Sequence, residues 1–100
     1  MQAYYAAEFQ REQGSTEAEW LQRLPGAVGA HALTLTGSGQ AAVAIGGGRL
    51  HLSWCVMPPR QIALVRIPRL QVRYAFETVA DDERQRFMKR FDLCIQRGGG

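Results

Sequence analysis

The chain has 100 residues, of which 46% are apolar, and its 12 Lys and Arg residues against 9 Asp and Glu give a formal net charge of +3. This length is too short for several domains, so we expect one domain over residues 1–100, with a flexible glycine tail at 97–100. The apolar content is enough to fill a core without a metal or a disulfide. The charge falls short of the density typical of dedicated nucleic-acid binders, although it permits an anionic partner.

The sequence also bears on the compartment. No window approaches the roughly 18 apolar residues of a membrane span, and the first five residues hold neither a basic leader nor an apolar run. Cys55 and Cys94 fit neither a disulfide framework nor a zinc-binding spacing, so we expect two reduced and mostly buried thiols. A soluble, cytoplasmic protein without membrane contact is therefore expected.

Residues 3–24 have the features of a broken helix, or of one helix with a kink near Gly14. Residues 3–12 lack helix breakers and are rich in Ala, Glu and Gln, which favours a first helical segment. Thr16 and Glu19 then have the spacing of a capping box, and apolar residues follow at helical intervals. The Pro-Gly pair at residues 25–26 is expected to end this second segment.

From residue 30 to residue 59, apolar and polar residues alternate with a period of two, which indicates β-strands. Glycine-rich turns at residues 37–39 and 46–48 separate the first strands, and Pro58 and Pro59 are expected to end the third. Turns at such short intervals require antiparallel neighbours.

A change of parity marks the next stretch, residues 60–77. Its apolar residues are odd-numbered before Pro68 and even-numbered after it: Val65 and Ile67, then Leu70, Val72, Tyr74 and Phe76. Because alternate residues of a strand point to opposite faces, one uninterrupted strand cannot bury both sets. Either Pro68 marks a bulge, or Pro68 and Arg69 form a two-residue turn. Both solutions place Arg66, Gln71 and Arg73 on the face away from the core.

The last element is an amphipathic helix. Its apolar residues fall at spacings of three and four and form one stripe, made of Phe87, Met88, Phe91, Cys94 and Ile95. We therefore predict an α+β fold with an N-terminal helical segment, an antiparallel meander of four or five strands, and a C-terminal amphipathic helix packed on one sheet face.

Residue types suited to metal binding or nucleophilic catalysis are few: His31, His51, Cys55 and Cys94. His51 and Cys55 share a strand face, but four residues at about 3.3 Å each separate them by roughly 13 Å, too far to bind one ion. Cys94 belongs to an apolar stripe, where a free cysteine is usually a core residue. We assign no catalytic residue, metal or cofactor and expect a protein that is not an enzyme.

Four arginines, Arg60, Arg66, Arg69 and Arg73, lie in a stretch without acidic residues and are the candidate binding site for an anionic partner. They favour single-stranded nucleic acid as one class of partner. Such binders also present aromatic side chains for base stacking, whereas Trp54, Tyr74 and Phe76 belong to the set expected in the core.

Three functions stay open. The first is a non-enzymatic protein-interaction module, for which exposed edge strands offer one route to a homodimer. The alternative is single-stranded nucleic-acid binding through an arginine-rich sheet face. The third is binding of a small molecule between sheet and helix, in a pocket lined by Trp54, Tyr74, Phe76, Phe87 and Phe91.

Overall fold

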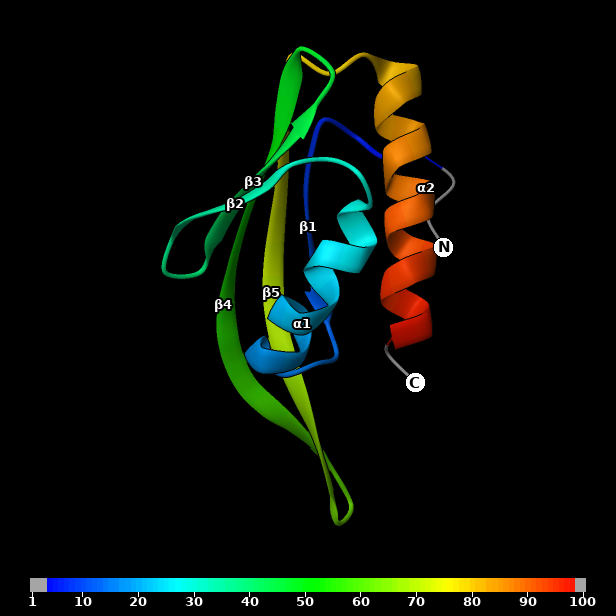
Figure 1. The fold of residues 1–100 in the computed structure, drawn as a ribbon. Coiled ribbons are helices and arrows are strands. Elements are labelled where there is room, and N and C mark those ends of the chain that lie inside the picture. Colours follow the sequence, from blue (N-terminus) through cyan, green and yellow to red (C-terminus); the bar gives the residue numbers. More distant parts are fainter. Residues whose placement is uncertain (1–3, 99–100) are drawn as a thin grey trace.

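A five-stranded antiparallel sheet carries two helices on one of its faces (Figure 1). The computed structural model describes residues 4–98. In chain order its elements are β1 (Glu8–Gln13), α1 (Glu17–Val28), β2 (Leu33–Gly37), β3 (Gln40–Ile45), β4 (Gly48–Ile62), β5 (Val65–Glu77) and α2 (Asp81–Gly98). The predicted α+β class is confirmed, with a C-terminal helix on one face of an antiparallel sheet. The predicted glycine tail begins inside α2, and its residues 99–100 lie outside the described residues.

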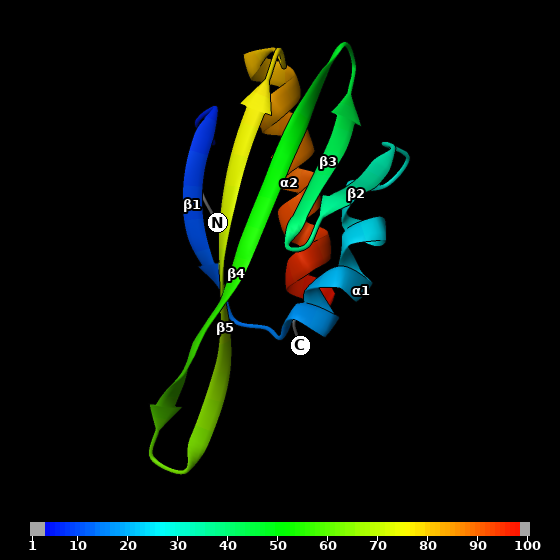
Figure 2. The same ribbon diagram turned by 90° about the vertical axis from the view of Figure 1, so that its left-hand side faces the viewer.

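The strands have the order β1-β5-β4-β3-β2, so that β2 to β5 form a continuous meander and β1 is added beside β5 (Figure 2). The two predicted glycine turns connect β2 with β3 and β3 with β4. Gly39 and Gly46 adopt left-handed φ angles of 70° and 57° in these turns, which glycine accepts without steric cost. β1 and β2 are the two edges of the sheet.

β1 replaces the helix predicted over residues 3–12. It pairs with β5 in antiparallel register, with Phe9 opposite Tyr74. The Phe9 ring stacks on the Tyr74 ring with 4.6 Å between the centroids. Helix propensity is a weak preference that tertiary contacts override, and this contact requires an extended backbone.

α1 begins where predicted and ends later. Thr16 accepts a 3.1 Å hydrogen bond from the Glu19 N–H, and the Glu19 carboxylate accepts a 2.9 Å bond from the Thr16 N–H, which confirms the capping box. The predicted stop at residues 25–26 is wrong, because Pro25 lies inside the helix and the C-cap is Gly29, with a φ of 63°. The apolar side chains that the helix buries beyond the proline are Ala27 and Val28.

β4 and β5 extend beyond the body of the sheet as a hairpin, which we call the arm (residues 57–69; Figures 1 and 2). Its turn is at residues 63–64, between Ile62 and its partner Val65. The predicted turn at Pro68 and Arg69 is therefore wrong.

A bulge does lie at Pro68, but its extra residue is in β4, so it does not shift the parity of β5 as the bulge alternative required. Pro58 and Pro59 lie opposite the single Pro68, where the pairing shifts between Met57 and Arg60. The predicted strand end at the first two prolines is wrong as well, because the strand continues through the bulge. Proline has no N–H for the ladder, so an irregularity of the pairing accommodates all three.

The core lies between the inner face of the sheet and the helices. Its largest buried side chains include Trp20, Leu24, Ile45, Leu50, Leu52, Leu70, Tyr74, Met88 and Phe91. The predicted stripe of α2 is confirmed, with Cys94 packed at its margin. Val65 and Ile67 were expected in the core and lie in the arm instead, where Val65 is 59% exposed.

A buried polar network joins β1, β5 and α2. Asp92 is 3% exposed and accepts a 2.5 Å hydrogen bond from the Tyr5 hydroxyl. Arg11 binds both oxygens of the same carboxylate and donates a 3.1 Å hydrogen bond to the Tyr74 hydroxyl. The Arg11 guanidinium also lies 4.8 Å from the centre of the Tyr74 ring. A bidentate pair of this kind fixes geometry as well as charge.

The segment before β1 is held against α2 through its backbone. The Gln85 side chain accepts a 2.8 Å hydrogen bond from the Tyr5 N–H and donates a 2.7 Å bond to the Tyr5 carbonyl. Arg84, which is 7% exposed, donates to the same carbonyl at 2.9 Å. The chain therefore enters β1 from a fixed position.

We expect Asp92→Ala to lower the free energy of unfolding by about 3 kcal/mol, because it removes the buried carboxylate that binds both the Arg11 guanidinium and the Tyr5 hydroxyl. Urea unfolding followed by circular dichroism measures the change. Asp82→Ala is the control, since Asp82 pairs with Arg86 on the exposed side of α2 and its loss should change stability little. Equal effects of the two substitutions would contradict a structural role for the network.

Stability should fall at alkaline pH. Burial, with a smaller contribution from Asp92, raises the pKa of Tyr5 to about 12, and burial raises the pKa of Tyr74 to about 12 against an opposing effect of Arg11. The folded state therefore keeps protons that the unfolded chain releases near pH 10, so this stability is complete below pH 10 and is lost as the pH rises toward 12. The free energy of unfolding, measured in steps from about pH 9 to about pH 11.5, should fall less steeply in Tyr74→Phe than in the wild type. An unchanged slope would speak against the raised pKa.

Candidate interaction surfaces

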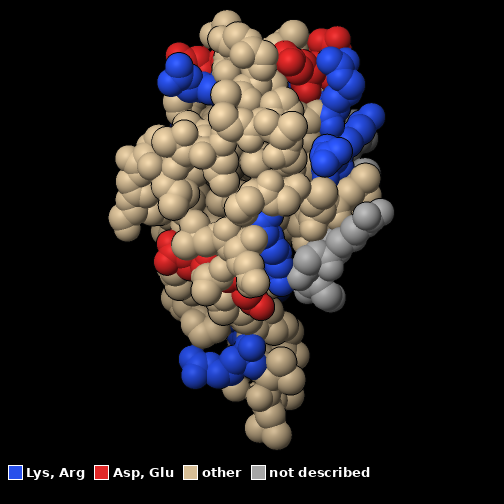
Figure 3. All heavy atoms as spheres, viewed as in Figure 1, with Lys and Arg blue, Asp and Glu red and all other residues tan. Residues whose placement is uncertain are grey.

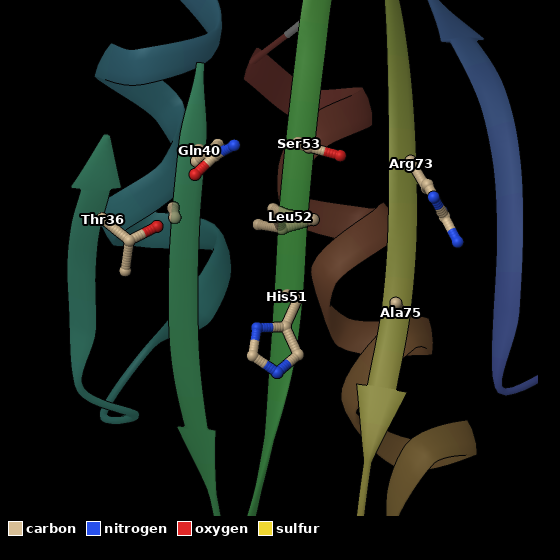
Figure 4. Close-up of a pocket in the computed structure, with 8 residues that line it drawn as sticks. Thr36, Gln40, His51, Leu52, Ser53, Arg73 and Ala75 are labelled. Carbon is tan, nitrogen blue, oxygen red and sulfur yellow. The ribbon is translucent and has the colours of Figure 1, made fainter. Parts of the chain in front are cut away.

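The outer face of the sheet, opposite the helices, is polar. Five of its side chains surround a shallow hollow of about 290 Å³: Thr36, Gln40, His51, Ser53 and Arg73 (Figure 4). His51 Nε2 lies 2.8 Å from Glu77 Oε1, and this hydrogen bond lowers the pKa of the Glu77 carboxyl. Sites that bind small molecules tightly are concave and mostly apolar, so an open polar hollow is a poor match for one.

Three of the four arginines predicted to bind an anionic partner pair with carboxylates of β1. Arg73 reaches Glu8 at 2.5 Å, and Arg60 and Arg69 reach Glu12 at 3.3 and 3.4 Å. Such exposed pairs contribute at most about 1 kcal/mol each to stability. An incoming phosphate would nevertheless compete with a carboxylate already in place.

The fourth arginine, Arg66, is exposed in the arm, beyond the shift in pairing. The inserted residue is in β4, so β5 alternates without interruption and places Arg66 and Arg73 on opposite sides of the strand. The two do not share a face, contrary to the prediction. The candidate residues therefore form a group beside β1 and one isolated side chain.

Glu8 and Glu12 are absent from the sequence-based site, because a helix over residues 3–12 would not align them with β5. The signal for a strand is present in the sequence. Glutamate, glutamine and glutamate at residues 8, 10 and 12 alternate with Phe9 and Arg11, which is a period of two.

The histidines and cysteines are dispersed. Cys55 is exposed, contrary to the expectation of a buried thiol, and Cys94 is half-buried. His31 Nδ1 lies 3.0 Å from the Ala44 carbonyl oxygen. Among residues 4–98, no three His, Cys, Asp or Glu side chains are grouped closely enough to hold a metal ion. The absence of enzymatic activity stays a prediction.

The aromatic side chains considered as the lining of a ligand pocket contact one another. Ring centroids lie 5.9 Å apart for Tyr74 and Phe91, 5.8 Å apart for Phe87 and Phe91, and 6.2 Å apart for Phe76 and Phe87. Trp54 is 8% exposed and meets Trp20 edge to face. These rings occupy the space between sheet and helices, which favours their role in the core.

The arm concentrates exposed apolar side chains. Leu64 at its tip is 96% exposed, and Ile62 and Val65 on either side of the turn are 54% and 59% exposed. Val56, just before the arm, is 67% exposed. In Figure 3 the tip of the arm, at the bottom, shows no charged atoms on the visible side. Apolar groups gathered on a projection mark an interaction site more often than apolar groups scattered singly.

The turn of the arm is itself strained. Ala63 has a φ of 53°, a left-handed conformation that glycine adopts more readily than alanine. The Gln61 side chain donates a 3.1 Å hydrogen bond to the Ala63 carbonyl and braces this conformation. The backbone of the turn is therefore held in one conformation, with Leu64 exposed at the tip of the arm.

Comparison with protein-family models, curated proteins and solved structures finds no match to this chain. Neither helix, within the part of the chain that the structure describes, is long and apolar enough to cross a membrane.

The arm should be dispensable for folding, because none of its residues is buried in the core. Val56 and Leu70 are partners at its base, so residues 57–69 can be replaced by Asn-Gly, which favours a tight hairpin turn. We expect this variant to keep a cooperative thermal transition and the circular dichroism of the sheet and helices. A loss of cooperative unfolding would show that the arm is part of the folding unit.

Proposed function

We propose that this protein is a non-enzymatic protein-interaction module whose arm is the binding element. The observation that carries the proposal is the exposed apolar tip, formed by Ile62, Leu64 and Val65 on a hairpin that contributes nothing to the core. Folding alone gives no reason to extend two strands past the sheet and place leucine at their end. A partner that buries this tip does give one, since fully burying one such side chain stabilises a complex by about 1.5–3 kcal/mol.

The composition of the arm favours a protein partner over a nucleic acid. Arg60 and Arg69 are already paired with Glu12, which leaves Arg66 to meet an anion. The tip is aliphatic and has no aromatic ring on which a base could stack. An aliphatic pocket of a folded protein is the better complement, with Arg66 at the polar rim of the interface.

A photo-reactive amino acid at residue 64 tests the proposal in cells. We expect one discrete protein adduct, which a probe at the exposed residue Arg49 on the outer sheet face should not give. The captured protein is then purified and titrated against the wild-type chain. Leu64→Asp should weaken binding by about tenfold or more, because a charge replaces the buried anchor.

Ala63→Gly is the matched control, because it relaxes the turn while keeping Leu64 and should bind as the wild type does. The same adducts at residues 64 and 49, or unchanged binding by Leu64→Asp, would contradict the proposal. Binding of single-stranded DNA that falls with salt and is lost in Arg66→Ala would favour the nucleic-acid alternative instead.

A further inference from the structure

The two edges of the sheet differ in charge. β1 carries Glu8, Arg11 and Glu12, whereas residues 24–48, which include β2 and β3, contain no Asp, Glu, Lys or Arg. The β2–β3 hairpin, which projects to the left in Figure 3, accordingly shows no charged atoms on the visible side. Charged side chains commonly protect an edge strand from pairing with another strand. β2 lacks this protection.

The backbone of β2 presents a defined set of groups at the edge. The Ala44 N–H donates a 2.9 Å hydrogen bond to the Ala32 carbonyl, so residue 32 bonds to β3. In an antiparallel pair such residues alternate with residues whose N–H and C=O point away from the neighbour. Thr34 therefore also bonds to β3, while Leu33 and Leu35 direct their N–H and C=O to the open side.

We propose that a second copy of this chain extends the sheet along β2, antiparallel and with the two-fold axis at Thr34. Leu33 of each copy then lies opposite Leu35 of the other, and both pairs exchange backbone hydrogen bonds. Thr34 lies opposite its own equivalent in a pair without hydrogen bonds, where the Cα atoms approach to about 4.5 Å. The assembly is a closed dimer with one continuous sheet.

The side chains of β2 are complementary to themselves in this arrangement. Leu33 and Leu35 point to the helix-covered face, because their β3 partners Val43 and Ala41 are buried. Leu35 is 61% exposed in the single chain, and Leu33 of the second copy would cover it. The threonines meet on the outer face, and threonine pairs across strands are favourable.

A bulge selects this register. Thr36 is an extra residue between Leu35, which lies opposite Ala41, and Gly37, which lies opposite Gln40. The regular edge therefore runs from Leu33, where β2 begins, to Leu35. A register shifted toward the C-terminus would have to pair through the bulge, and one shifted the other way would have to pair residues that precede the strand. The interface is short, so we expect weak association that becomes visible only at high protein concentration.

The other edge of the sheet does not offer the same solution. The Phe76 N–H donates a 2.7 Å hydrogen bond to the Ala7 carbonyl, so the outward positions of β1 are Glu8, Gln10 and Glu12. Self-pairing about Gln10 would place Glu8 of one copy opposite Glu12 of the other. Like charges directly opposite each other destabilise a strand pair.

Sedimentation velocity of the full chain, from about 5 μM to about 1 mM, should show a reversible shift to twice the chain mass. Thr34 is exposed, so its replacement leaves the fold intact. Thr34→Lys and Thr34→Glu should each weaken self-association by about tenfold or more, because like charges meet on the axis. An equimolar mixture of the two should restore the dimer. Gln10→Lys and Gln10→Glu, at the matching position of β1, should dimerise as the wild type does.

A monomer at every concentration, or a dimer that neither Thr34 substitution weakens, would overturn the proposal. The register has its own test in a Cys55→Ser background. Thr34→Cys should form an intermolecular disulfide more readily than Thr36→Cys, since the pair on the axis has Cα atoms within bridging distance, and equal cross-linking would overturn this register. The variant without residues 57–69 keeps β2 and should still dimerise, so this result does not depend on a partner for the arm.

Discussion

The position of β1 in this structure depends on the hydrogen bonds that the Asp92 carboxylate accepts. This carboxylate binds Arg11 and the Tyr5 hydroxyl, and Arg11 in turn binds the hydroxyl of Tyr74. One helix, two strands and the segment before β1 thus meet at a single charge. Buried polar networks of this kind are costly when incomplete, so the network selects one position for β1 and rejects others. Once β1 lies beside β5, Glu8 and Glu12 are placed against the arginines of the neighbouring strand and the arm.

Local sequence patterns predict those parts of the fold that neighbouring residues determine. The alternation from residue 30 onward, the two glycine turns, the capping box of Thr16 and Glu19, and the stripe of α2 all act within a few residues, and all are present in the structure. Local patterns do not predict β1, because groups far away in the sequence stabilise its extended form. These groups are Tyr74 and Asp92, which lie 63 and 81 residues from Arg11. The composition of β1 itself favours a helix, and the tertiary contacts outweigh that preference.

For the candidate site too, the sequence predicts what depends on neighbouring residues and misses what depends on distant ones. A run of four arginines is visible in the sequence, but the carboxylates that pair with three of them become apparent only when β1 is seen beside β5. An irregularity does lie opposite Pro68, but it is in β4 and leaves the parity of β5 unchanged. Whether this irregularity is a turn or a bulge depends on how β4 pairs with β5. Most of β4 lies outside residues 60–77, so this stretch alone cannot decide between them. Leu64 is unremarkable in sequence, and its exposure follows from a hairpin that runs beyond the helices.

The prolines at residues 58, 59 and 68 divide the β4–β5 ladder into two parts. None of them can donate a backbone hydrogen bond, so the ladder of the arm and the ladder of the body are joined by a stretch with few shared bonds. Local opening beyond that stretch need not disturb the core, because cooperative units end where contacts are sparse. Substitutions in the arm are likewise separated from the requirements of folding. Substitutions in the proposed binding tip can therefore accumulate while the residues that specify the fold stay the same.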